Sequence, residues 1–193
     1  MTTTDQAVDL VGEATVGNLA RAALFAAATS ATAPVSVTHP LAPNIPITLQ
    51  TLWVFLAGLF LGPLWAGVSF VLYLLAGVVG LPVFAGATGG VGHLFGGTGG
   101  YLFGFVFGAI ATGLVAHGTS LESPRAIPLP RLVAAPVVGA VVVYAFGVVG
   151  LMLALGLGLV TAVTTGVLPF LPTAAIKVGA SVLVARSDAV VPR

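Results

Sequence analysis

The sequence predicts an all-α integral membrane protein, built as a compact bundle of about six transmembrane helices with a glycine-rich loop on the outer side. Three observations lead to this fold class. Of the 193 residues, 58% are hydrophobic and only 6% are charged, whereas about a quarter of the residues of a soluble domain are charged. The charged residues gather near the two ends of the chain and in one loop, which leaves long apolar stretches between them. Glycine and proline cluster between those stretches, as is typical of turns.

The chain is expected to form one membrane domain with two short tails. The acidic N-terminal tail lacks the basic cluster of a secretory signal peptide. No polar segment is long enough to fold as a second domain. The expected parts are an acidic cytoplasmic tail at 1–15, the membrane domain at 16–188 and a C-terminal tail at 189–193.

Runs of about 17–25 apolar residues define the expected spans. Gly62 and Pro63 predict a tight turn, so the second and third spans should form a helical hairpin. The stretch 158–171 is open to two interpretations, since it can extend the fifth span or lie along the membrane interface. The expected spans are 18–35, 47–61, 64–80, 100–117, 132–157 and 172–185.

The basic residues predict the orientation, because Lys and Arg are retained on the cytoplasmic side of short loops. An even number of spans places both termini on one side of the membrane. With the termini in the cytoplasm, every arginine beyond the first span also lies there, and the outer connections 36–46 and 81–99 carry no Lys or Arg. The charged residues of the inner loop and C-terminus are Glu122, Arg125, Arg131, Arg186 and Arg193.

Lys177 is the most informative single residue, because an ammonium group inside an apolar span costs a few kcal/mol. Thr173, Lys177 and Ser181 follow one another at intervals of four residues and form one polar stripe on the last span. This stripe should face the bundle interior near the outer surface, where Lys177 is expected to bind an anion. The alternative is a lysine whose long side chain reaches the nearest membrane interface.

Two outer segments carry further candidates. Gln50 follows Thr48 at the outer start of the second span, and its amide suits a neutral polar ligand, although Thr48 can also serve as a helix cap. The segment 81–101 is rich in glycine and uncharged, and its Phe84, Phe95 and Tyr101 make it too apolar for a flexible linker. It lacks the Gly-Lys-Ser/Thr ending of a phosphate-binding loop. We expect it to cover a cavity.

These outer features together favour a site for a small amphiphilic carboxylate. Histidines 39, 93 and 117 are scattered, so no metal site or cofactor is expected, and the absence of cysteine excludes thiolate ligands. Spans without Asp or Glu argue against a proton-coupled carrier, and no nucleophile–base motif supports an enzyme. The net charge of +1 argues against nucleic acid.

Four motifs resemble the BioY family, the biotin-specific S components of energy-coupling-factor (ECF) vitamin transporters. They are ITLQTLWVFLAG at 47–58, GLPVFAGATGG at 80–90, GGTGGYLFGF at 96–105 and VLPFLPTAAIK at 167–177. The resemblance implies a six-helix subunit in the cell membrane that captures biotin from outside and docks on a membrane-embedded T protein carrying two ATPase subunits.

The resemblance also implies roles for individual residues. Lys177 would meet the biotin carboxylate, and small residues of the first helix would pack on the T protein. Two positions depart from the family pattern, with Ala174 in place of an Asp and Gly97 in place of a Pro. The expected ligand-binding residues are Lys177, Gln50, Tyr101, Gly89, Gly90, Phe84, His93 and Thr48, and the expected partner-binding residues are Ala23 and Ala27.

Two other functions stay open on the sequence. The chain can be an S component for another small vitamin carboxylate, which the change at Ala174 allows. It can also be a stand-alone facilitator or a structural membrane subunit that needs no ATPase.

Overall fold

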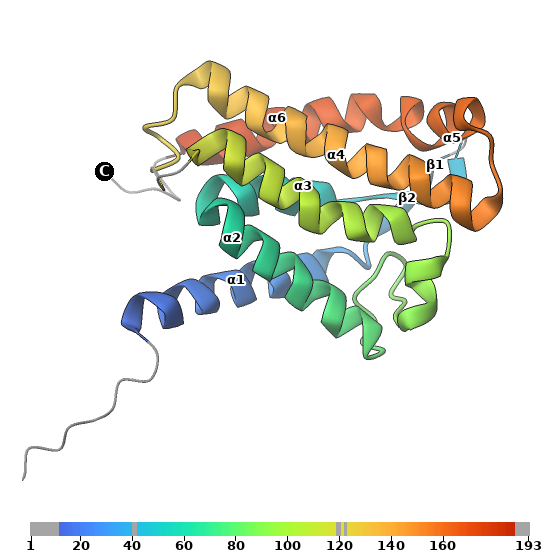
Figure 1. The fold of residues 1–193 in the computed structure, drawn as a ribbon, viewed down its shortest axis with the longest axis horizontal. Helices are drawn as coiled ribbons and strands as arrows, with labels where there is room; N and C mark the ends of the chain where they lie inside the picture. Colours follow the sequence, from blue (N-terminus) through green and yellow to red (C-terminus); the bar gives the residue numbers. More distant parts are fainter. Residues whose placement is uncertain (1–11, 40–41, 119–120, 122, 188–193) are drawn as a thin grey trace, which may run out of the picture.

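A computed structural model describes residues 12–39, 42–118, 121 and 123–187. Its elements are α1 (Glu13–Thr32), β1 (Ser36–His39), β2 (Ala42–Thr48), α2 (Gln50–Val78), η1 (Val91–Phe95), α3 (Gly99–His117), α4 (Leu129–Leu155), α5 (Leu159–Gly166), η2 (Leu168–Phe170) and α6 (Leu171–Arg186). The helices lie roughly along one common direction (Figure 1). Most of the acidic tail and all of 189–193 lie outside the described residues, and α1 already begins at Glu13.

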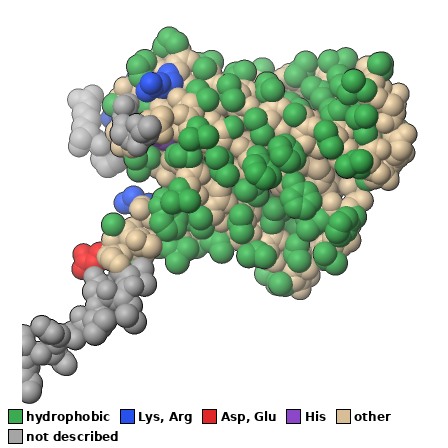
Figure 2. All heavy atoms as spheres, in the orientation of Figure 1, with side chains coloured by type: hydrophobic (Ala, Val, Ile, Leu, Met, Phe, Trp, Pro, Cys, Tyr) green, Lys and Arg blue, Asp and Glu red, His purple; other side chains and the backbone are tan. Residues whose placement is uncertain are grey.

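Among the described residues, four helical stretches are long and apolar enough to cross a membrane: α2, α3, α4 and 159–186. Hydrophobic side chains cover most of the face shown in Figure 2, and the Lys and Arg side chains visible there gather at its left end. A surface of this kind suits lipid rather than water. The prediction of a helical membrane protein is therefore confirmed, with four span-capable helical stretches among the described residues and one short β-ribbon.

Helix α2 reverses direction at Gly62, as the Gly-Pro pair predicted. Gly62 has φ 73° and ψ 176°, a conformation that a residue with a Cβ rarely adopts. Along the first half of α2, the contacts with α3 move toward the C-terminus of α3. Along the second half of α2, they move back toward the N-terminus of α3. The approaching pairs are Val54 with Gly108, Pro63 with Gly113 and Phe70 with Phe105. The two halves of α2 are therefore antiparallel, and no separate loop joins them (Figure 1).

Glycines let α3 approach α4 closely. A Cβ atom on Gly104 would lie 2.9 Å from the Val143 carbonyl oxygen, and one on Gly108 would lie 3.0 Å from the Gly139 carbonyl oxygen. In lipid, where burial of apolar surface does not drive helix association, such close van der Waals packing holds helices together. Gly100, Gly104 and Gly108 follow one another at intervals of four residues and thus form one flat face of α3.

The connection after α1 is a two-stranded antiparallel ribbon, which was not predicted from the sequence. Strand β1 pairs with β2 in a register that places Ser36 opposite Thr48 and Val37 opposite Ile47. Valine, isoleucine and threonine favour extended backbone. The ribbon delivers the chain directly to the start of α2, where the candidate site begins.

The stretch 158–171 does not extend the fifth span. Gly156 adopts the left-handed conformation, with φ 65° and ψ 23°, and ends α4. Helix α5 and the short η2 then lead into α6, and the buried Ala162 and Gly166 anchor α5 to the bundle. This segment brings the start of α6 to the same end of the molecule as the ribbon (Figure 1), and Phe170 lines one cavity together with residues of β2.

Candidate ligand-binding site

A cavity of about 260 Å³ lies at the end of the bundle that holds the ribbon, opposite the end that holds the loop between α3 and α4. Its volume is just below the roughly 300 Å³ at which typical small-molecule pockets begin. The lining residues are Ile45, Pro46, Ile47, Thr48, Gln50, Thr51, Phe84, Ala85, Thr88, His93, Thr98, Tyr101, Leu102, Phe105, Tyr144, Phe170, Thr173 and Lys177. Apolar and aromatic groups therefore enclose a small number of polar ones.

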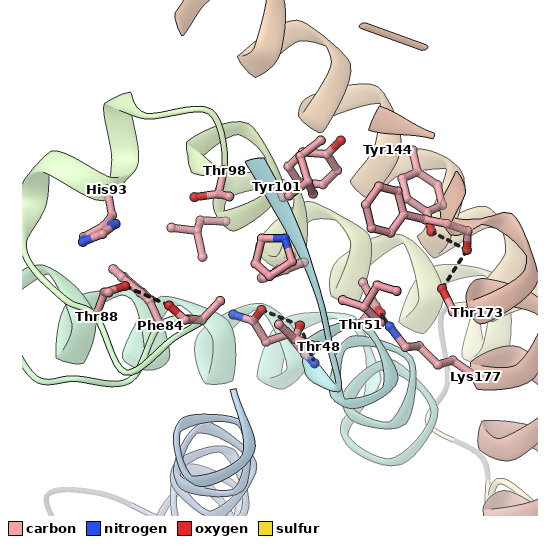
Figure 3. A pocket seen from close by; sticks show the side chains of 18 residues that line it. Thr48, Thr51, Phe84, Thr88, His93, Thr98, Tyr101, Tyr144, Thr173 and Lys177 are labelled. Carbon is pink, nitrogen blue, oxygen red and sulfur yellow. Dashed lines mark hydrogen bonds between the residues drawn. The ribbon is translucent and has the colours of Figure 1, made fainter. Parts of the chain in front are cut away.

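Lys177 lies at one end of the cavity, as its position in the last span predicted. Its Nζ donates a hydrogen bond of 2.7 Å to Thr51 Oγ1 (Figure 3). Thr173 lines the same cavity and Ser181 is fully buried, so the polar stripe of α6 faces the bundle interior. Lys177 is the only lysine of the sequence.

The described residues that line the cavity include no Asp or Glu. Ala174, three residues before Lys177, is buried and offers no side-chain oxygen. The ammonium group of Lys177 is thus held by a neutral hydroxyl rather than by a carboxylate. A half-buried cation with only neutral partners favours an anionic ligand, because such a ligand supplies the missing charge.

Gln50 opens α2 inside the cavity and belongs to a hydrogen-bonded chain. Thr48 Oγ1 donates to Gln50 Oε1 over 2.6 Å, and Gln50 Nε2 donates to Tyr73 Oη over 2.6 Å. Tyr73 Oη donates in turn to the Val83 carbonyl oxygen over 3.0 Å. Thr48 is not the cap of α2, because the N-cap position is Leu49 and it has no side-chain cap hydrogen bond. Thr48 lines the cavity, and its Oγ1 also accepts a hydrogen bond of 3.3 Å from the Gln50 backbone N–H.

Tyr101 lines the cavity with its ring while its hydroxyl is used elsewhere. Its Oη donates to the Gly166 carbonyl oxygen over 2.7 Å, and Gly147 leaves room for the ring. The side chain is 7% exposed. Tyr101 therefore ties α3 to α5 and presents an apolar wall to a ligand.

The glycine-rich segment covers the other end of the cavity. Figure 3 places Phe84, Thr88 and His93 there, away from Lys177 and Thr51. The rings of Phe84 and His93 meet edge to face with centroids 5.9 Å apart. Phe84 and His93 thus line the same cavity as Lys177, and the segment between α2 and α3 includes the short helix η1.

Gly89 and Gly90 are not among the described residues that line the cavity, and the contact of their backbone with a ligand stays a prediction. The Gly90 N–H donates to the Gly77 carbonyl oxygen over 2.7 Å. A Cβ on Gly89 would lie 2.2 Å from the Leu81 carbonyl oxygen. These two glycines hold the segment against the end of α2. Gly97 lies instead near Leu155 of α4.

Several of the residues that line the cavity were not named from the sequence. Thr88 and Thr98 lie in the glycine-rich segment that was expected to cover a cavity, so their place in that segment was a usable signal. Tyr144 lines the cavity from inside the hydrophobic run of α4, and Tyr73, which bonds to Gln50 without lining the cavity, lies inside that of α2; a single tyrosine in such a run carries no positional pattern. Only the packing of distant segments reveals these two tyrosines.

The remaining His, Asp and Glu side chains of the described residues form no second cluster. His117 lies near the opposite end, with its Nε2 3.0 Å from the Leu59 carbonyl oxygen. Among the described residues, no three His, Asp or Glu side chains are grouped so as to hold a metal ion.

Comparison with known proteins decides the family. The chain matches the BioY family over residues 3–192. It belongs to the BioY family. A relative from Pyrococcus horikoshii, described as a probable biotin transporter BioY, is 37% identical over 168 residues, which are 85% of this chain and 91% of that protein. The biotin transporter BioY of Rhodobacter capsulatus is 39% identical over 161 residues, which are 78% and 82% of the two chains.

The BioY fold is matched in three dimensions as well. A crystal structure of the S-component for biotin from an ECF-type ABC transporter superposes with a TM-score of 0.78. The two chains are 25% identical, and the match covers 92% of this chain and 93% of the other. The predicted resemblance to BioY is thereby confirmed over nearly the whole chain.

Proposed function

We propose that this BioY protein captures biotin from the outer side of the membrane as the substrate-binding S component of an ATP-driven ECF transporter. The observation that carries the proposal is the position of the only lysine, which points from α6 into a largely apolar cavity and is held there by Thr51. Biotin combines a carboxylate, an aliphatic chain and a fused ring system with a ureido group. The cavity offers a cation, apolar walls and amide or hydroxyl groups to match.

The cavity supports one orientation of the ligand. The carboxylate would lie at Lys177 and Thr51, and the ring system would reach the end that holds Phe84, Thr88 and His93. Tyr101 would form a wall between them. This orientation places the one charged group of biotin on the one cation among the lining residues of the described chain.

The proposal includes six spans with both termini in the cytoplasm. The spans would be α1, the two halves of α2, α3, α4 and α6 with its preceding α5. The cavity and the ribbon lie at one end of the bundle (Figure 1), and the basic side chains visible in Figure 2 lie at the other. Since basic residues mark the cytoplasmic side, the cavity would open outward.

The proposed partners are a membrane-embedded T protein and two ATPase subunits. On α1, Ala22 and Ala26 are buried against the bundle, whereas Ala23 and Ala27 are exposed. Two small exposed residues one turn apart allow another helix to approach closely. Replacing both Ala23 and Ala27 by Leu should abolish co-purification with the T protein, while Leu at the exposed Ala134 of α4 is the matched control.

The decisive experiment measures binding of labelled biotin to the purified protein in detergent. Lys177→Met removes the charge at similar length, and Arg131→Met makes the same change at the exposed start of α4. We expect Lys177→Met to weaken biotin binding by about 30-fold or more, because truncating one partner of a buried charge pair costs 2–5 kcal/mol. Biotin methyl ester lacks the negative charge, so it should bind the wild type and Lys177→Met equally. Arg131→Met should bind biotin as tightly as the wild type does.

Other outcomes point to the alternatives. A folded wild-type protein that ignores biotin but binds another vitamin carboxylate is an S component for that vitamin. Biotin uptake into vesicles that contain this chain alone, at a rate that ATP and the ATPase subunits do not raise, identifies a facilitator.

A further inference from the structure

A hydrogen-bonded chain leads from the cavity to the backbone of the glycine-rich segment. Thr48, Gln50, Tyr73 and Val83 follow one another in it, with donor–acceptor distances of 2.6, 2.6 and 3.0 Å. Tyr73 is fully buried and is not among the cavity-lining residues, whereas Thr48 and Gln50 are. Tyr73 therefore contacts no ligand and can act only through Gln50.

The Val83 carbonyl gives this chain a single direction. A carbonyl oxygen accepts hydrogen bonds and donates none, so the Tyr73 hydroxyl must donate its proton to Val83. The Tyr73 oxygen is then left as an acceptor, and the group of Gln50 that faces it must be the NH₂. It follows that Gln50 Oε1 faces Thr48, whose hydroxyl donates to it.

Without such neighbours, a glutamine amide can flip, so that its oxygen and its NH₂ group exchange places, because the two groups are nearly equal in size. Here the turned amide would place an oxygen against the Tyr73 oxygen, whose only proton is committed to Val83. That arrangement leaves two acceptors facing each other in a buried place, which costs the desolvation of both. Tyr73 thus holds the amide of Gln50 in one orientation, with its NH₂ group toward Tyr73 and its oxygen toward Thr48.

One N–H group of the Gln50 amide is left without a partner among the described residues. Its NH₂ carries two N–H groups, of which Tyr73 takes one, and the described residues provide no further partner for Nε2. Because Gln50 lines the cavity, this second N–H is available to a ligand.

We propose that Tyr73 is a positioning residue that makes Gln50 a hydrogen-bond donor to the ligand and so selects a ligand with a carbonyl acceptor over one with a donor at the same place. The inference rests on the proposed function, since the ureido carbonyl of biotin is the acceptor in question. Selection of this kind is strong in general, because a mismatched ligand leaves a buried polar group unpaired.

The test compares two ligands in three proteins. The ligands are biotin and its 2-imino analogue, in which an imino group replaces the ureido oxygen and presents N–H donors instead. The proteins are the wild type, Tyr73→Phe and Tyr101→Phe. Tyr101→Phe is the matched control, because it also removes one buried hydroxyl that donates to a backbone carbonyl but leaves Gln50 untouched.

We expect the wild type to prefer biotin, and Tyr73→Phe to lower the ratio of the two affinities by about tenfold, the value of one hydrogen bond. Tyr101→Phe should change both affinities together and leave the ratio at its wild-type value. General damage to the fold would also affect both ligands alike, so the ratio separates positioning from structural support.

Gln50→Glu is the second variant, since it keeps the side-chain shape but removes the amide donor, and it should lose the preference for biotin even if Tyr73→Phe does not fold. A wild-type ratio in Tyr73→Phe, or a Gln50→Glu variant that still prefers biotin, overturns the proposal while biotin binding itself stands. Failure of the wild type to bind biotin overturns the proposed function and this inference with it.

Discussion

Gly77→Ala offers a direct test of how the Phe84 ring forms the cavity wall. A Cβ atom at Gly77 would lie 2.0 Å from Phe84 Cζ and 2.2 Å from Cε1. Carbon atoms in contact are normally about 3.5 Å apart, so the ring has to move by roughly 1.5 Å. The ring is buried and meets Tyr73 edge to face at 5.7 Å and His93 at 5.9 Å. The cavity is the open space beside it.

The size of the effect follows from two opposing contributions. Inserting a methyl group into a well-packed place costs about 1–3 kcal/mol. Replacing a helical glycine by alanine returns about 1 kcal/mol through helix propensity. The fold should therefore lose little stability, with a melting temperature only a few degrees lower. The displaced ring occupies part of a cavity of about 260 Å³, so biotin affinity should fall by about tenfold to a hundredfold.

The assay is equilibrium binding of labelled biotin in detergent, together with thermal unfolding of the same samples. Gly179→Ala is the matched control, because Gly179 lies in α6 with nothing within 4 Å of an added Cβ. It should bind biotin like the wild type and melt at the same temperature or higher. In a Phe84→Ala background the Gly77→Ala change should cost nothing more, since the ring that it displaces is gone.

The reasoning is refuted if Gly77→Ala binds biotin as tightly as Gly179→Ala does. It is also refuted if Gly77→Ala weakens binding equally with and without the Phe84 ring, because the effect would then pass through another contact.

Three further predictions concern separate parts of the molecule. Gly108→Leu should destabilise the bundle by about 3 kcal/mol or more, measured as a loss of monodisperse protein on heating, because its Cβ would already lie 2.6 Å from Val143 Cγ2; unchanged melting would contradict the proposed close packing of α3 on α4. Thr51→Val should weaken biotin binding by about threefold to tenfold, since it removes the hydrogen bond that holds Lys177, and Thr51→Ser should restore it; equal binding by Val and Ser variants would show that the hydroxyl has no such role. Arg186→Gln should lower stability by about 1 kcal/mol, because it loses its hydrogen bonds to the Arg125 and Ile127 carbonyl oxygens. Biotin affinity should stay unchanged, and a weaker affinity would contradict the placement of the ligand at the opposite end of the bundle.

The helices of this protein were predictable because the bilayer leaves the backbone few choices. The expected spans 100–117 and 172–185 agree closely with α3 (Gly99–His117) and α6 (Leu171–Arg186). Backbone groups in lipid must be satisfied within their own segment, so hydrophobic length alone marks a helix. The reversal at Gly62 was predictable for a related reason, since the Gly-Pro pair is a local signal.

The ribbon and part of the site were not predictable, because they depend on distant contacts. The pairing of β1 with β2 joins segments with no clear alternating pattern, and α5 follows a helix end that only the conformation of Gly156 reveals. The close approach of Gly89 and Gly90 to the backbone of Leu81 and Gly77 was not predictable either. A glycine beside a ligand and a glycine that makes room for neighbouring backbone look alike in a sequence.

The sole lysine of the chain gives the protein a built-in chemical reporter. Since Lys177 is the only lysine, a reagent for primary amines can modify the side chains of this protein only inside the cavity. A bound carboxylate would shield that amine, so the extent of modification at residue 177, read by peptide mass, would report occupancy. Unlabelled ligands could then be ranked in intact membranes, where neither detergent nor radiolabel is needed.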